Sequence, residues 1–175
     1  HRIVRISSPA RSRLCESTVG ARVKIHGLAG SGKTTVLAKR AVNAHKRHGE
    51  RVLILTYNLT LCMYIRDKIN EVREDFPWAK FEIINYHKFM MFALNSAGIN
   101  IEFEKETENV DKKLEEKYFS NTLVFSDLHI DNKYDTILID EIQDYKPEWL
   151  KIIKTYFLES DGEMVLFGDE KQNIY

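Results

Sequence analysis

At 175 residues the chain is long enough for one compact domain with a real hydrophobic core, with two small domains as the alternative. Its 43% apolar and 30% charged residues are typical of a protein that folds in water, and no apolar run approaches the roughly 18 residues of a membrane span. The 26 basic residues balance the 26 acidic ones, but they are unevenly distributed. Residues 1–51 hold 12 Lys and Arg and only 2 Asp and Glu, whereas the rest of the chain holds 14 Lys and Arg and 24 Asp and Glu. This basic third suits a phosphate-rich partner, or it only solvates a surface.

The N-terminal residues and the two cysteines indicate an intracellular protein. Residues 1–13 carry charge but no apolar core of a signal peptide, and a leading His in place of Met suggests an excised fragment. Cys15 and Cys62 lie far apart and outside any C-x-x-C pattern, which indicates reduced thiols and neither a disulfide nor a zinc site. We expect a cytoplasmic location, associated with the nucleoid in a bacterium, and no membrane partner.

Strand and helix patterns alternate along the chain. Continuous apolar or β-branched runs predict strands at 21–27, 51–57, 80–87, 134–140 and 163–169. Apolar residues at helical spacing predict helices from Lys33 to a stop at Gly49, from Leu59 to about Asp75, over 88–98, and from Pro147 to about Phe157. This alternation predicts an α/β protein with a mostly parallel sheet and helices on both faces.

Residues 99–133 interrupt the alternation. The stretch is acidic at first and then apolar, and it includes one charged helical pattern. We therefore expect an inserted subdomain or lid at this point.

A glycine-rich segment, GLAGSGKT at 27–34, matches G-x-x-x-x-G-K-[ST] between a predicted strand and a predicted helix. Such a loop turns its amide groups toward phosphate oxygens, and the start of the helix adds partial positive charge. Lys33 is expected to reach the β- and γ-phosphates of ATP, and Thr34 to hold Mg²⁺. The alternative is a glycine-rich turn without a ligand. The nucleotide-binding residues expected in this loop and the start of its helix are Gly27, Ala29, Gly30, Ser31, Gly32, Lys33, Thr34 and Thr35.

Carboxylates crowd the end of a second apolar run, IDEIQD at 139–144. Buried carboxylates repel one another unless a cation or a donor compensates them. A strand ending at Asp140 would carry its carboxylate to the carboxyl edge of the sheet, beside the phosphate loop, where Mg²⁺ compensates it. Glu141 is then placed to orient or deprotonate the attacking water. The alternative is a solvated acidic helix start.

Five segments in this order resemble one family. GLAGSGKTT, LTYN, NYHKF, IDEIQD and GDEKQNIY are similar to the first RecA-like domain of superfamily 1A DNA helicases, the UvrD/Rep/PcrA-like group. The resemblance covers roughly residues 21–98 and 134–175. It implies a single N-terminal RecA-like P-loop NTPase domain, residues 1–175, from which the second RecA-like domain is missing.

The resemblance also implies roles for individual residues. Gln172 would sense the γ-phosphate as a catalytic residue beside Lys33 and Glu141. Gln143 would be a further nucleotide-binding residue and would couple the nucleotide site to DNA. The residues implied to contact DNA are Thr56, Tyr57, Asn58, Tyr86, His87 and Tyr175. From their chemistry alone, Thr56, Tyr57 and Asn58 could bind phosphate and stack a base, or they could equally finish a strand and cap a helix.

Some positions depart from the family. Ala10 and Arg11 stand where an adenine-reading glutamine is expected, Thr35 replaces an Arg that packs on the base, and Leu59 replaces a basic residue. The excursion at 99–133 is also shorter than the family's accessory subdomain.

The function implied is that of the ATP-binding half of an ATP-dependent 3′–5′ DNA helicase or translocase. Its expected partners are single-stranded DNA, duplex junctions and the second RecA-like domain. The fragment alone should bind Mg²⁺-ATP but not act as a helicase. Two alternatives are another P-loop enzyme, such as a small-molecule kinase, and a nucleotide-switched interaction module without catalysis.

Overall fold

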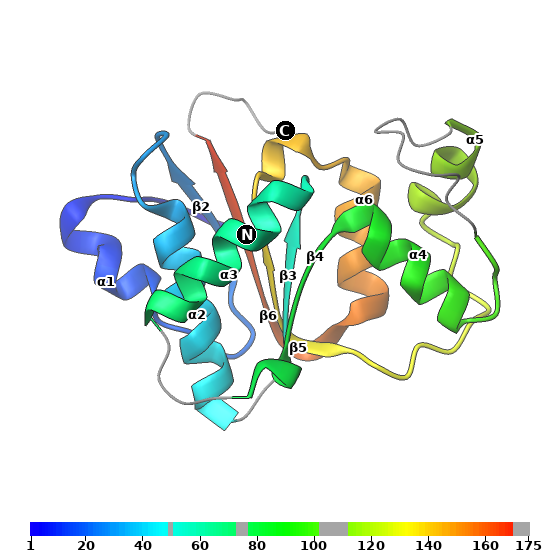
Figure 1. Cartoon of the computed structure of the whole chain (residues 1–175), viewed down its shortest axis with the longest axis horizontal. Coiled ribbons are helices and arrows are strands. Elements are labelled where there is room, and N and C mark those ends of the chain that lie inside the picture. The colour runs from blue at the N-terminus through cyan, green and yellow to red at the C-terminus, as the bar shows by residue number, and fades with distance from the viewer. Residues whose placement is uncertain (49–50, 73–76, 102–111, 170–175) are drawn as a thin grey trace.

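The computed structural model describes residues 1–48, 51–72, 77–101 and 112–169. Within them, a six-stranded sheet forms the middle layer, in the order β1-β2-β6-β5-β3-β4 (Figure 1). The strands are β1 Arg2–Arg5, β2 Arg22–Gly27, β3 Val52–Thr56, β4 Phe81–Asn85, β5 Tyr134–Ile139 and β6 Leu158–Asp169. The helices are α1 Arg11–Leu14, α2 Lys33–His48, α3 Leu59–Val72, α4 Tyr86–Ser96, α5 Lys112–Leu114 and α6 Pro147–Ile152.

All pairs of described strands are parallel. The carboxyl ends of β2, β6, β5, β3 and β4 therefore lie along one edge of the sheet, which we call the carboxyl edge. Gly27 at the end of β2 pairs with Asp169 at the end of β6, and Ile139 of β5 pairs with Leu55 of β3. The predicted α/β architecture is confirmed.

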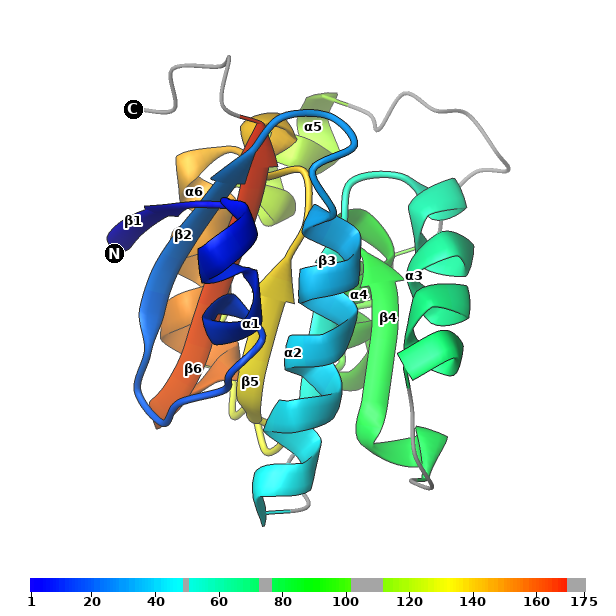
Figure 2. The ribbon, with the colours of Figure 1, turned by 90° about the vertical axis from the view of Figure 1, so that its left-hand side faces the viewer.

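Helices cover both faces of this sheet, with α1, α2 and α3 on one side and α4 and α6 on the other (Figures 1 and 2). The alternation of side chains along β3 explains why its sequence is apolar throughout. Val52 and Ile54 join the core beneath α2 and α3, whereas Leu53 and Leu55 join the core beneath α4 and α6. A strand buried on both faces cannot carry polar residues at alternate positions.

The main differences from the sequence prediction are the starts of α4 and β6 and one additional strand, β1. Tyr86 and His87 begin α4 instead of ending a strand, because the Asn85 side chain accepts a hydrogen bond from the Lys88 amide and caps the helix. Strand β6 begins at Leu158, five positions before the predicted start. The edge strand β1 was not predicted, since its short run RIVR carries two charges in four residues.

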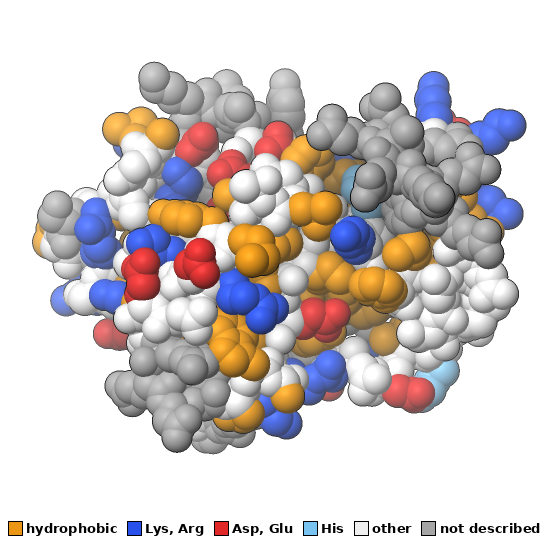
Figure 3. Space-filling model, viewed as in Figure 1, with side chains coloured by type: hydrophobic (Ala, Val, Ile, Leu, Met, Phe, Trp, Pro, Cys, Tyr) orange, Lys and Arg blue, Asp and Glu red, His pale blue; other side chains and the backbone are white. Residues whose placement is uncertain are grey.

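The described part of the excursion packs against the rest of the molecule. Phe119 and Phe125 are buried in the same core as residues of β5 and α6. On the face seen in Figure 3, basic and acidic side chains are interspersed among hydrophobic ones. In the portion that the structure describes, no helix is both long and apolar enough to cross a membrane.

Candidate functional site

The loop between β2 and α2 has the backbone of a phosphate cradle. Gly30 and Gly32 adopt left-handed conformations, with φ of 76° and 88°, which side chains rarely permit. A Cβ atom on Gly27 would lie 2.3 Å from the Ser31 Oγ, so any side chain there would displace this hydroxyl. Among the described residues the buried Ser31 Oγ has no hydrogen-bond partner, which leaves a hydroxyl inside the loop for a ligand oxygen.

Lys33, the first residue of α2, folds back over this loop. Its Nζ donates to the carbonyl oxygens of Gly27 at 2.9 Å and Leu28 at 3.1 Å. It also donates to Asp169 Oδ1 at 2.7 Å, and the Lys33 side chain is only 10% exposed. A buried ammonium of this kind holds its position through charged and carbonyl partners that an incoming phosphate can replace.

Asp169 was not among the predicted site residues, although it stands in the GDEKQNIY segment. Its strand β6 lies between β2 and β5, so its carboxylate rather than that of Asp140 reaches Lys33. Asp140 was predicted at the carboxyl edge beside the phosphate loop, and it lies at that edge, one strand further from β2 than Asp169 and near enough for the Lys33 ammonium to lower its pKa. Strand order depends on pairings between distant segments, which the sequence pattern did not reveal.

Asp140 follows β5 and is 2% exposed. The amide of Glu141 donates to its Oδ1 at 2.9 Å. Burial raises the pKa of Asp140 to about 6, against the opposing effects of that amide and of the Lys33 ammonium, while the carboxylates of Glu141 and Asp169 raise it further. Asp140 thus lies at the same edge as the phosphate loop and lacks full compensation for its charge.

Glu141 is held in a strained backbone conformation. Its φ of 51° is the one positive value among described non-glycine residues. The Glu141 carbonyl accepts from the Asp144 amide at 2.9 Å, and Gln143 Nε2 donates to its carboxylate. The Gln143 Oε1 is buried without a partner in the described part of the chain. This turn fixes the Glu141 carboxylate at the carboxyl edge and leaves an acceptor of Gln143 free for a donor.

Thr34 and Asp140 are the residues that would hold Mg²⁺. Thr34 directly follows Lys33 in the first turn of α2, and Asp140 directly follows β5 at the same edge. No cluster of three or more His, Cys, Asp or Glu side chains that could hold a metal occurs among the residues described. This donor set fits Mg²⁺, which is usually bound by one or two protein groups together with phosphate oxygens and water.

The segment after β3 divides into structural and exposed residues. Thr56 is buried, and its hydroxyl donates to the Asn58 carbonyl at 2.8 Å. The Asn58 side chain accepts from the Leu61 amide at 2.9 Å and thereby caps α3. Tyr57 between them is 45% exposed. Asn58 is exposed as well, but its side chain is engaged in the cap, whereas the Tyr57 ring faces solvent.

Tyr86 and His87 are both engaged inside the protein. The Tyr86 hydroxyl donates to the Phe119 carbonyl at 2.6 Å, and its ring stacks on Trp149 with centroids 4.4 Å apart. The Nε2 of His87 lies 3.1 Å from Glu115 Oε2. Burial lowers the pKa of His87, against the pull of Glu115 in the other direction. These two residues anchor the excursion to the start of α4.

Glu115 is the second residue of note that the sequence did not single out. Its carboxylate accepts from Trp149 Nε1 at 2.8 Å and Lys146 Nζ at 3.0 Å, and from the Ser120 hydroxyl. Burial acts to raise the pKa of Glu115, but these hydrogen bonds outweigh it and leave the pKa below its usual value. Nothing in the run LEEKY distinguishes Glu115 from its neighbour Glu116, which is exposed.

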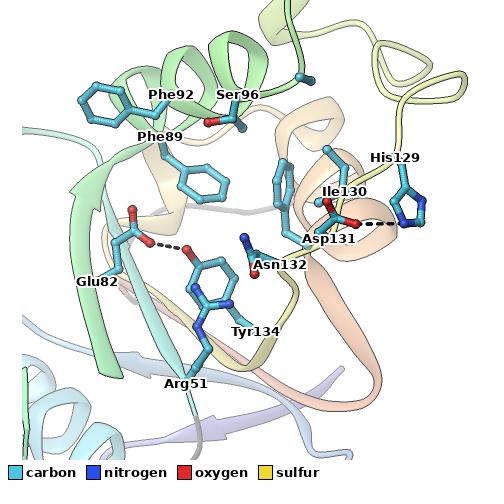
Figure 4. A pocket seen from close by; sticks show the side chains of 13 residues that line it. Arg51, Glu82, Phe89, Phe92, Ser96, His129, Ile130, Asp131, Asn132 and Tyr134 are labelled. Atoms are coloured by element: carbon cyan, nitrogen blue, oxygen red, sulfur yellow. Dashed lines mark hydrogen bonds and ion pairs between the residues drawn. The ribbon is translucent and has the colours of Figure 1, made fainter. Parts of the chain in front are cut away.

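A cavity of about 300 Å³ opens at the opposite end of the sheet (Figure 4). Its wall includes Arg51, Glu82 and Tyr134, which lie near the amino ends of β3, β4 and β5. The Tyr134 hydroxyl donates to Glu82, and the Arg51 guanidinium lies 4.6 Å from the centre of the Tyr134 ring. Because it lies at the amino ends of these strands, this cavity is separate from the candidate site at the carboxyl edge.

Two predicted site residues, Gln172 and Tyr175, lie outside the described residues. Of the others, the loop residues 27–35, Asp140, Glu141 and Gln143 are gathered at one half of the carboxyl edge, and the segment 56–58 at the other. A protein family model described as an AAA domain matches residues 13–175. No curated protein sequence matches the chain significantly.

Proposed function

Since the chain belongs to the AAA domain family, we propose that it is the ATP-binding half of an ATP-dependent DNA helicase or single-stranded-DNA translocase. Its described strands form one parallel sheet with helices on both faces, the α/β architecture of a RecA-like P-loop domain. P-loop domains of this kind bind ATP with Mg²⁺. The residues that fit this chemistry are those of the glycine-rich loop, Lys33, Thr34 and Asp140.

The observation that carries the proposal is the pairing of Lys33 with Asp169. An ammonium that begins α2 meets a carboxylate that ends β6, 136 positions away in the sequence, at 2.7 Å. This contact brings Asp169, at the described start of the GDEKQNIY segment, to the phosphate loop. Both segments belong to the set that resembles superfamily 1A helicases, and a chance match would have no reason to bring them into contact.

Different residues at the carboxyl edge would bind the phosphates and activate the attacking water. Lys33 and the loop amides would bind the phosphates, with the Ser31 hydroxyl as an additional donor. Mg²⁺, when bound, supplies positive charge against the phosphate oxygens. Glu141 is the residue proposed to accept a proton from the attacking water, and the Gln143 amide fixes the orientation of its carboxylate.

Coupling to DNA requires a second surface. The exposed Tyr57 follows β3, two strands from Asp169 along the sheet order β6-β5-β3. An aromatic ring at this position can stack a base of single-stranded DNA. We further propose that the protein moves 3′–5′ along DNA and acts at duplex junctions. A second RecA-like domain would supply arginines that raise the rate of ATP hydrolysis by about 10³ to 10⁵.

The proposal is tested with the full-length protein. ATP hydrolysis should rise strongly with single-stranded DNA, and Glu141→Gln should lower kcat at least about a hundredfold while ATP still binds. Asp144→Asn is the matched control, because Asp144 is an exposed carboxylate three residues away. Turnover that depends on a small phosphate acceptor would instead identify a kinase, and nucleotide-dependent partner binding without turnover would identify a switch.

A further inference from the structure

Tyr145 connects the turn that holds Glu141 to the strand that precedes Tyr57. It directly follows Asp144 in the sequence and is 7% exposed. Its hydroxyl donates to the Thr56 carbonyl at 2.7 Å, across 89 positions of the sequence. The two ends of this hydrogen bond therefore lie in segments proposed to bind different ligands, ATP and single-stranded DNA.

The Tyr145 side chain is held rigidly at this position. Burial raises the pKa of its hydroxyl above the ordinary value, so the group stays protonated and acts as a donor. Its ring makes edge contacts with Tyr86 and Trp149, at centroid distances of 5.9 Å and 5.5 Å. The acceptor is a backbone atom of the residue just before the exposed Tyr57. Because the ring is packed in this way, a shift of the Thr56 carbonyl either lengthens the hydrogen bond or moves the Tyr145 backbone.

The turn at the other end of the bond is strained. Glu141 has a φ of 51°, a left-handed conformation that persists only where neighbouring contacts hold it. The Asp144 amide donates to the Glu141 carbonyl at 2.9 Å. The Tyr145 amide donates to the Ile142 carbonyl at 3.1 Å. Tyr145 thus closes the strained turn with its backbone and bonds to β3 with its side chain, so that movement at β3 can release or reinforce the position of the Glu141 carboxylate.

Other bonds in this region do not join the turn to the end of β3. The Asp140 amide donates to the Leu55 carbonyl at 2.9 Å, which continues the pairing of β5 with β3 ahead of the turn. Gln143, to which the family resemblance assigns the coupling role, donates to Glu141 within the turn. Of the hydrogen bonds described between 140–145 and 55–58, the Tyr145 bond is the one made by a side chain.

We propose that Tyr145 is a positioning residue through which single-stranded DNA sets the orientation of Glu141 and thereby the rate of ATP hydrolysis. A base stacked on Tyr57 shifts the adjacent Thr56 carbonyl, and the Tyr145 hydrogen bond transmits this shift to the strained turn. The turn is the element with two arrangements that both ligands bias. The inference rests on the proposed function, because it needs ATP and DNA bound at the two segments.

Removing the hydroxyl alone tests this role in the full-length protein. With saturating single-stranded DNA, Tyr145→Phe should lower kcat at least about fivefold and leave the KM for ATP within about twofold, because other residues hold the phosphates. Tyr156→Phe is the matched control, since the Tyr156 hydroxyl also donates to a backbone carbonyl, that of Thr122 in the excursion, at 2.9 Å. An unchanged kcat in Tyr145→Phe, a parallel rise in its KM, or an equal loss in Tyr156→Phe would overturn the assignment.

Binding measurements give a second readout that does not depend on turnover. Calorimetry with a non-hydrolysable ATP analogue, with and without single-stranded DNA, gives the factor by which DNA changes nucleotide affinity. Coupling of binding is reciprocal, so anisotropy of labelled DNA with and without the analogue should give the same factor. Tyr145→Phe should bring both factors close to 1, and Tyr156→Phe should leave them as in the wild type. A wild-type factor of 1, or an unaltered factor in Tyr145→Phe, would contradict the inference.

Hydrogen exchange in the wild type tests the same connection without a substitution, and it decides the matter if Tyr145→Phe does not fold. Single-stranded DNA, without nucleotide, should change the exchange of the Asp144 and Tyr145 amides at least about threefold. The Ala97 amide, which donates to the Ala93 carbonyl at 3.1 Å at the far end of α4, is the internal control. Equal exchange with and without DNA would overturn the inference. If the wild type binds neither the analogue nor DNA, the proposed function fails instead.

Discussion

The two halves of the carboxyl edge use polar residues in different ways. At the end of β2 and β6, Lys33 and Asp169 form a charged contact, and Ser31 keeps a buried hydroxyl without a described partner. At the end of β3 and β4, Thr56, Asn58 and Asn85 close turns and cap helices. Buried polar groups without a hydrogen-bond partner in the protein indicate a ligand site, whereas polar groups with such partners stabilise the fold.

The difference also separates the predicted nucleotide site from the predicted DNA surface. In the former, Lys33 is held by Asp169, and the Ser31 Oγ and Gln143 Oε1 atoms are buried without a partner among the described residues. Of the described residues predicted for the latter, Tyr57 is exposed, whereas Tyr86 and His87 bond to the excursion. The four experiments below contrast the two halves, from the largest expected effect to the smallest.

Removing the ammonium at the phosphate loop should have the largest effect. Lys33→Ala is expected to weaken Mg²⁺-ATP binding by about 100-fold to 1,000-fold, because it removes a charged donor worth about 3 to 4 kcal/mol with the phosphates. Calorimetry gives the dissociation constant, and Lys151→Ala on the exposed side of α6 serves as the control. An unchanged constant would remove Lys33 from the site.

Glu115 tests the structural role of the other half. Glu115→Gln replaces an acceptor of four hydrogen bonds by an amide that places a donor among donors. We expect a loss of about 2 to 3 kcal/mol in the free energy of unfolding, measured with urea. Glu116→Gln, at an exposed neighbouring position, should cost less than about 0.5 kcal/mol. Similar losses for both variants would show that the buried network adds nothing.

Tyr57 and Asn58 should separate DNA binding from stability. Tyr57→Ala is expected to lower the affinity for single-stranded DNA about tenfold, at unchanged stability, since stacking is worth about 1 to 3 kcal/mol per base. Asn58→Ala should lower stability by about 1 kcal/mol through loss of the α3 cap and change DNA affinity less than threefold. Fluorescence anisotropy and urea unfolding measure the two effects, and the reverse pattern would refute the division.

Asp140 predicts a pH effect of known sign. Because burial raises its pKa from 3.8 to about 6, the folded state binds the proton more tightly than the unfolded state, and rising pH costs stability through this group. Without Mg²⁺, the free energy of unfolding of the wild type should therefore fall by about 1 kcal/mol relative to that of Asp140→Asn as the pH rises from 5 to 8. Urea unfolding at both values checks this, and a constant difference would contradict the assigned pKa.

The fold was predictable where a local pattern had one physical solution. β3 was found because a strand covered on both faces must be apolar throughout, and the loop at 27–34 because glycines with positive φ must precede the helix. The start of α4 was misplaced because the Asn85 cap competes with a strand continuation of similar composition. Asp169 and Glu115 were missed because their partners lie at distant positions of the sequence.

By itself, the sequence determined the alternation of strands and helices, the phosphate loop and the carboxylates at 140 and 141, since each depends on neighbouring residues. Only the tertiary structure decided that β6 separates β2 from β5, that Asp169 is the partner of Lys33, and that Arg11 lies against Gly32. These contacts arise from the order in which parallel strands pair. Strand order is set by the packing of the whole sheet and its helices, which leaves no local trace in composition or spacing.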